Sequence, residues 1–250
     1  YIYNQTSYLI KFMQTEQVEL PSKGLIYPSE NPLSSGKIEM QYMTATHEDI
    51  LTNQSYIQNG TVLDKLLQSL IVSKINYNDL IIGDKNAIMV AARILGYGKD
   101  YSFEYDGNSY TVDLSTIDNK PFDDSKLIKK GANEFDFTLP STNIKITFKI
   151  LTHDDEQKIQ TELNGLKKIN KNASHELSTR LKYIIVSVEG NRDIKVIRDF
   201  VDKDLLARDS RELRKYIKEI QPDVDLTFFP EGNTSRIDIP VGVKFFWPDA

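Results

Sequence analysis

The C-terminal stretch from Ala207 onward constrains the fold most, because it places a helix and paired strands in one continuous segment. The Asp-Ser-Arg-Glu sequence at 209–212 resembles a capped helix start, and Pro222 stops the helix after residue 220. Alternating stretches at 225–229 and 236–247 then predict a closing strand pair. Helices and antiparallel strands that are close together in the sequence are typical of α+β proteins.

Patterns typical of helices and of strands recur along the rest of the chain. Strand-like alternation marks 37–43, 134–139 and 143–150, and Asp106-Gly107-Asn108 between 101–105 and 109–113 is a hairpin signature. Helical apolar stripes follow Thr61 and Asp84, and two long helices are predicted after Thr152 and Ser174, the second with Ile185 and Val188 facing the core. We therefore expect an α+β fold, in which helices pack with short antiparallel strands and hairpins in two α+β halves.

A polar segment suggests how the chain is divided. Residues 115–133 contain Pro121, paired aspartates, four lysines and Gly131, which favours a linker or a long surface loop. The resulting division has four parts: an extended arm at 1–16, an α+β unit at 17–114, the linker at 115–133, and a second α+β unit at 134–250 that ends in a β-hairpin.

Charge and composition narrow the classes of partner. A net charge of −5 and a pI near 5.4 argue against nucleic acid and anionic membranes as the main partners. No apolar run is long enough to cross a bilayer, and the first ten residues do not resemble a signal peptide. The absence of cysteine excludes disulfides, thiolate zinc sites and thiol catalysis, and it fits a reducing compartment.

The sequence contains no persuasive catalytic or metal-binding pattern. His47, His153 and His175 are far apart, each near a predicted helix start, so we interpret them as polar first-turn residues. Asp123-Asp124 and Asp154-Asp155 are neighbours that point apart or cap helices. We expect no catalytic residues, cofactor or metal. The weaker alternative is a hydrolase acting on phosphate or sugar substrates, which would use these acidic pairs and the arginines of 208–214.

Three groups of residues are candidates for a protein interface. In a strand, Phe245, Phe246 and Trp247 cannot all face one side, so at least one should point away from the local core. Burial of all three inside the chain is the alternative. The second group is Leu20, Leu25, Ile26 and Tyr27, around the bends at Pro21 and Pro28. The same two possibilities apply to it, contact with a partner or burial inside the chain. The third group is Arg208, Arg211 and Arg214, for which a solvated, ion-paired helix face is the alternative.

Several segments resemble the baseplate hub assembly proteins of contractile-tailed, T-even-like bacteriophages. They are Leu20-Pro-Ser-Lys-Gly-Leu-Ile-Tyr-Pro28, Met43 to Leu51, Asn59-Gly60, Leu80-Ile-Ile-Gly-Asp-Lys-Asn-Ala87 with Gly96-Tyr97-Gly98, and 207–249. Some members of that family carry a Cys-x-x-Cys knuckle before a closing Phe-Phe-Trp-Pro. This chain has Phe228 to Ser235 there and no cysteine, so the metal-stabilised loop is not expected, and a plain hairpin turn at Glu231-Gly232-Asn233 would suffice.

The resemblance implies a viral protein made in the host bacterial cytoplasm. It would bind other baseplate hub or tail proteins without catalysis, either as a transient chaperone or as a permanent structural subunit retained in the virion baseplate. Nucleic acid and membranes are not expected as partners. Self-association through the N-terminal tyrosines Tyr1, Tyr3 and Tyr8 stays open.

Overall fold

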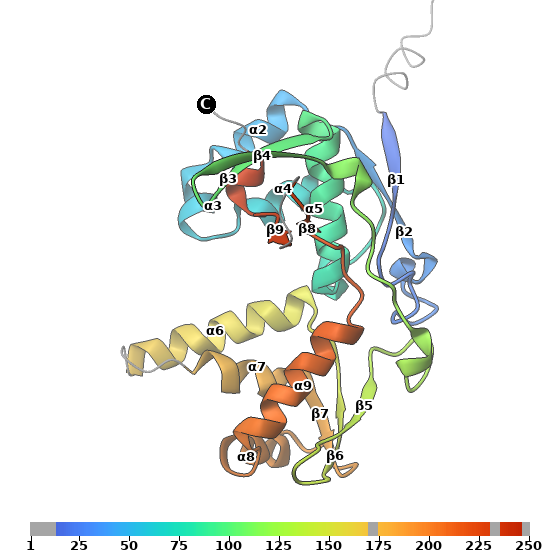
Figure 1. Cartoon of the computed structure of the whole chain (residues 1–250), viewed down its shortest axis with the longest axis vertical. Helices are drawn as coiled ribbons and strands as arrows, with labels where there is room; N and C mark the ends of the chain where they lie inside the picture. The colour runs from blue at the N-terminus through green and yellow to red at the C-terminus, as the bar shows by residue number, and fades with distance from the viewer. Residues whose placement is uncertain (1–13, 170–174, 231–235, 247–250) are drawn as a thin grey trace, which may run out of the picture.

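The computed structural model of the chain describes residues 14–169, 175–230 and 236–246. The helices and strands form two lobes, one above the other in Figure 1, and each lobe combines helices with a small antiparallel sheet. This arrangement confirms the expected α+β fold with two α+β halves. The predicted N-terminal arm falls almost entirely outside the described residues.

The first lobe is built around helix α5, with two hairpins and three further helices packed about it (Figure 1). Its elements are β1 (Thr15–Glu19), η1 (Pro32–Ser35), β2 (Lys37–Gln41), α2 (Ala45–Leu51), α3 (Gln54–Gln58), α4 (Val62–Leu70), η2 (Tyr77–Asp79), α5 (Ile82–Tyr97), β3 (Asp100–Tyr105) and β4 (Asn108–Asp113). Strands β1 and β2 pair antiparallel, as do β3 and β4. The predicted hairpin is confirmed, because Asp106 and Gly107 take the positive φ angles of 49° and 75° that a tight turn needs.

The second lobe places four helices around a three-stranded sheet of order β5-β6-β7. Its elements are β5 (Phe135–Thr138), β6 (Lys145–Phe148), α6 (His153–Ile169), α7 (Glu176–Ile184), β7 (Ile185–Val188), α8 (Ile194–Lys203) and α9 (Ala207–Ile220). The sequence prediction placed Ile185 and Val188 on a helix, which is wrong. The β-branched run at 184–186 favours a strand, and the turn at Glu189-Gly190 ends it with positive φ angles.

The closing segment leaves the second lobe after α9 and returns to the first. Strand β8 (Thr227–Phe228) pairs with β9 (Ile237–Asp238), and the ring of Phe228 lies 5.6 Å from those of Phe103 and Tyr110. The Tyr101 hydroxyl donates a hydrogen bond to the carbonyl of Pro240 (3.1 Å). The predicted division at 133 therefore separates segments that meet in space, because the end of the second unit packs on the first lobe.

The connection between the lobes is better packed than its polar sequence suggests. It contains two short turns, η3 (Leu114–Thr116) and η4 (Asp124–Lys126), with Phe122 and Leu127 buried. Asn119 forms a bridge with Val224, so the outgoing and returning chains run side by side. One hydrophobic cluster spans both lobes, and Leu151, Ile159 and Leu163 form a smaller one.

Candidate protein-interaction surface

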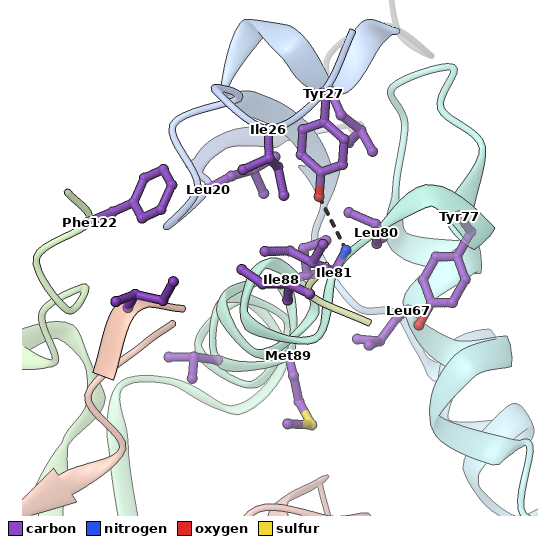
Figure 2. Packing of buried hydrophobic residues seen from close by; sticks show 14 of the residues in the cluster. Leu20, Ile26, Tyr27, Leu67, Tyr77, Leu80, Ile81, Ile88, Met89 and Phe122 are labelled. Atoms are coloured by element: carbon purple, nitrogen blue, oxygen red, sulfur yellow. Dashed lines mark hydrogen bonds between the residues drawn. The ribbon is translucent and has the colours of Figure 1, made fainter. Parts of the chain in front are cut away.

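The loop from Leu20 to Pro28 covers the N-terminal end of α5. Leu20, Ile26 and Tyr27 are 5% exposed or less, and Leu25 is half-buried. Figure 2 shows Leu20, Ile26 and Tyr27 pointing into the core above α5, with the Tyr27 hydroxyl directed at the backbone of Ile81. The expectation that this group forms an interface is therefore wrong for the three buried residues, because the chain's own helix already covers them.

A buried carboxylate holds this loop in place. Asp84, in the first turn of α5, is fully buried and accepts hydrogen bonds from the Ser22 backbone nitrogen (2.9 Å), the Ser22 hydroxyl (2.7 Å) and the Tyr27 hydroxyl (2.6 Å). Burial raises the pKa of Asp84, although these three hydrogen bonds act to lower it. Burial and the neighbouring Asp84 carboxylate raise the pKa of Tyr27. Asp84 therefore fixes the loop. Its predicted role as the cap of the helix is wrong, because Ile81 is the N-cap residue of α5 and no side chain caps it.

A second polar cluster joins the two lobes. His153, the first residue of α6, donates its backbone N–H to the Leu80 carbonyl (2.8 Å), and its ring packs edge-on against Tyr77 with centroids 4.8 Å apart. Lys85 forms an ion pair with Asp64 (2.5 Å) and lies 3.5 Å from His153 Nδ1. Burial lowers the pKa of His153. The first-turn interpretation missed this cluster, because it unites residues from four separate elements.

A pocket of about 740 Å³ opens beside this junction. Asn31, Asn76, Asp79, Glu134 and Asp154 are among its lining residues. The amide groups of Asn31 and Asn76 both donate to the Asp79 carboxylate at 2.8 Å, which ties two loops together. Glu134 forms a bidentate ion pair with the exposed Arg192, and the hydrogen bonds from Arg192 lower the pKa of Glu134. Each of these carboxylates thus has a partner within the chain, because Asp154 also pairs with a lysine.

The acidic pairs considered for a hydrolase have separate local roles. Asp123 accepts hydrogen bonds from Ser125, and Asp124 pairs with Lys130. Asp154 pairs with Lys158 one turn along α6. Asp155 forms the predicted capping contact with Thr152, and it also binds Lys149 at 2.7 Å. The structure therefore gives neither pair a shared point to which both carboxylates are directed.

The aromatic residues near the C-terminus are also internal where they are described. Phe245 and Phe246 are 1% and 0% exposed, and Phe245 packs edge-on against Tyr101 at 4.7 Å. They lie in a 3-10 turn, η5 (Val243–Phe246), and not in the predicted strand. Strand alternation does not apply to these residues, because a helical turn can direct consecutive side chains into one core. Trp247 lies outside the described residues.

Helix α9 is held firmly against the second lobe. Leu213 is fully buried, and the ring of Tyr216 stacks on Phe137 of β5 with centroids 4.9 Å apart. Asp209, in the first turn, is fully buried and accepts hydrogen bonds from the Ser141 backbone nitrogen (2.8 Å) and the Thr142 hydroxyl (2.9 Å). One face of the helix is therefore fixed to the sheet and to its β5–β6 turn.

The opposite face of α9 carries a row of exposed basic residues. Arg208, Arg211, Lys215 and Lys218 recur at intervals of three and four residues, which places them on one side of a helix. Arg214, also exposed, lies at the edge of the row and contacts the Ser210 carbonyl at 3.3 Å. We call these five residues the basic row. Its two lysines, Lys215 and Lys218, were not among the predicted interface residues.

Few of these charges are neutralised locally. Within the part of the chain that the structure describes, Arg211 pairs with Glu212 (3.2 Å), and the other members of the basic row form no ion pair. Glu219 is exposed and lies four residues from Lys215, yet the two form no ion pair. The ion-paired alternative therefore holds for Arg211 and is wrong for Arg208 and Arg214, the other two arginines predicted from the sequence. An acidic chain that concentrates unpaired cations on a rigid helix offers a surface for a negatively charged partner.

Comparisons with models of known protein families, with curated protein sequences and with solved structures find no match. Among the described residues, no helix is both long enough and apolar enough to cross a membrane. The same residues contain no group of three or more histidine, aspartate or glutamate side chains that could hold a metal ion.

Proposed function

We propose that the chain is a non-enzymatic assembly factor of the baseplate hub in a contractile-tailed bacteriophage. It acts as a chaperone in the host bacterial cytoplasm and binds other hub or tail proteins. The alternative is a permanent structural subunit of the hub, which would use the same kind of surface.

The observation that carries the proposal is the contact between two of the segments that resemble this family. Segments 20–28 and 80–87 are far apart in sequence, and Asp84 joins them through Ser22 and Tyr27. Distant segments that resemble one family and also meet in a buried contact are expected when an architecture is shared. The resemblance therefore concerns residues that build the first lobe, which supports the proposal.

The basic row provides the second support. Assembly factors act by contact, and α9 presents its unpaired cations on a helix whose other face is fixed by Leu213, Tyr216 and Asp209. A rigid surface loses little conformational freedom on binding, which favours specific association.

Co-expression with candidate hub proteins, followed by capture of the chain, tests the proposal. We expect at least one hub protein to be captured together with the chain at a fixed ratio. If a folded sample of the chain captures none of them, the proposal is wrong.

Mass spectrometry of purified virions separates the chaperone from the subunit. We expect the chain to be absent from mature particles, because a chaperone leaves after assembly. Its presence in stoichiometric amounts would favour the permanent subunit.

A further inference from the structure

The basic row has a spacing that restricts which partners it fits. Arg208, Arg211, Lys215 and Lys218 follow one another at about 4.5 to 6 Å along the helix axis and span about 15 Å in all. This is also the spacing of side chains that share one face of any other α-helix. A second helix alongside α9 could therefore oppose each cation with a carboxylate.

Nucleic acid fits this surface less well. A nucleic acid strand presents a continuous line of phosphates, about 3.4 Å apart along each strand of a duplex. Glu212 and Glu219 lie along one edge of the basic row and would repel such a line. A helix with carboxylates on one face avoids this conflict, because its charges are discrete and can lie opposite the cations and away from Glu212 and Glu219.

We propose that the basic row is the docking site for an acidic α-helix of a partner protein, with carboxylates spaced three and four residues apart. This inference rests on the proposed assembly function and names the chemistry of the partner. The affinity comes from several solvent-exposed ion pairs, so it decreases strongly with salt.

A synthetic helix tests the inference without any phage protein. The probe is a fluorescent peptide of about 20 residues, cross-linked between turns to keep it helical, with four glutamates at i, i+3, i+7 and i+10. Its control has the same composition, with the glutamates distributed around the helix. Fluorescence anisotropy measures binding of each peptide to the full chain.

We expect the matched peptide to bind at least about tenfold more tightly than its control, and to lose at least about tenfold in affinity between 50 and 300 mM salt. Equal affinities for the two peptides would overturn the inference, because charge alone would then explain binding. A duplex DNA of 20 base pairs that binds more tightly than the matched peptide would also overturn it.

Charge reversal locates the site. The variant Arg208→Glu/Arg211→Glu/Lys215→Glu/Lys218→Glu should abolish binding of the matched peptide. The control variant reverses Lys65, Lys74, Lys126 and Lys129, which are exposed, form no ion pair among the described residues and change the net charge equally. We expect the control to retain most of the affinity. Equal losses in both variants, with circular dichroism showing that both are folded, would refute the site.

A negative result has a distinct meaning for each proposal. If the matched peptide binds and no hub protein is captured, the docking site stands and the assembly function fails. If a hub protein is captured equally well by the row-reversed variant, the assembly function stands and this docking site is wrong.

Discussion

At the residue scale, the Tyr27 hydroxyl is a central link between the loop and α5. It donates to Asp84 (2.6 Å) and accepts the backbone N–H of Ile81 (3.2 Å). Tyr27→Phe leaves that N–H without an acceptor and removes one of the donors to the carboxylate. We expect a loss of about 1–3 kcal/mol in the free energy of unfolding.

Urea denaturation of Tyr27→Phe and of a matched control checks this prediction. Tyr42 is the control, because its hydroxyl binds Glu16 at the surface and its side chain is 36% exposed. Tyr42→Phe should change stability by less than about 0.5 kcal/mol. Similar losses in both variants would show that the buried link has no special role.

His153 gives the lobe junction a dependence on pH. Burial lowers its pKa in the folded chain below the ordinary value of 6.5, so the unfolded chain binds a proton first as the pH falls. Stability should therefore decrease as the pH drops below about 6.5 and stop decreasing below the folded pKa, by at most about 1.4 kcal/mol per pH unit.

Comparison with His153→Gln isolates this effect from other titrating groups. Asp84 acts in the opposite direction, because its raised pKa favours the folded state on the acid side. Urea midpoints at pH 7.5, 6.5 and 5.5 should fall more steeply for the native chain than for the variant. Parallel profiles would contradict the prediction.

At the element scale, α5 and the segment that follows α9 meet without space for a side chain. A Cβ atom on Gly83 would lie 1.8 Å from the Pro222 carbonyl oxygen, and the Asn86 amide donates to Asp223 at 2.9 Å. Gly83→Ala should therefore force α5 and the Pro222–Asp223 segment apart. We expect the free energy of unfolding to decrease by about 1–3 kcal/mol or more, although alanine is a better helix former than glycine.

Thermal melting of Gly83→Ala checks this prediction, and Gly165→Ala is the matched control. Gly165 lies in α6, and a Cβ there would meet nothing within 4 Å. Gly165→Ala should raise stability by about 0.5–1 kcal/mol, because only helix propensity changes. If Gly83→Ala stabilises the chain to the same extent, the close approach of Gly83 to Pro222 is wrong.

The sequence was most informative where one element determines its own structure. Periodicity and turn residues predicted the β3–β4 hairpin, the strands β5 and β6 and the helix before Pro222. They failed for β7, where a helical stripe runs directly into a β-branched run, and for η5, where Gly242 permits a turn within an apparent strand. Local patterns cannot show which of two compatible structures the tertiary contacts select.

The candidate interaction surface could also be predicted only in part from the sequence. The arginines of α9 were identified from sequence, because helix spacing alone places them on one face. Among the described residues Arg208 and Arg214 have no ion-pair partner, and Ile26 and Phe246 are buried. Both properties depend on which distant segments lie beside these residues. The cluster of Asp64, Lys85 and His153 could not be predicted from the sequence, because its members come from three different helices.

At the scale of the whole molecule, the closing segment belongs to the first lobe in space and to the second in sequence. Phe246 is fully buried, and its neighbour Phe245 contacts Tyr101 of β3. Phe246→Ala should cost about 3–5 kcal/mol, because it empties a core aromatic site. Its effect should appear in the first lobe, although residue 246 follows the whole second lobe in the chain.

Hydrogen exchange resolves where the loss occurs, with Phe148→Ala as the matched control. Phe148 is also fully buried, but it stacks on Phe135 within the second lobe. We expect Phe246→Ala to accelerate exchange in β3, β4 and the end of α5, and Phe148→Ala to accelerate it in β5 to β7. Exchange that rises uniformly in both variants would mean that the lobes unfold as one unit, so that the closing segment stabilises the whole chain rather than the first lobe.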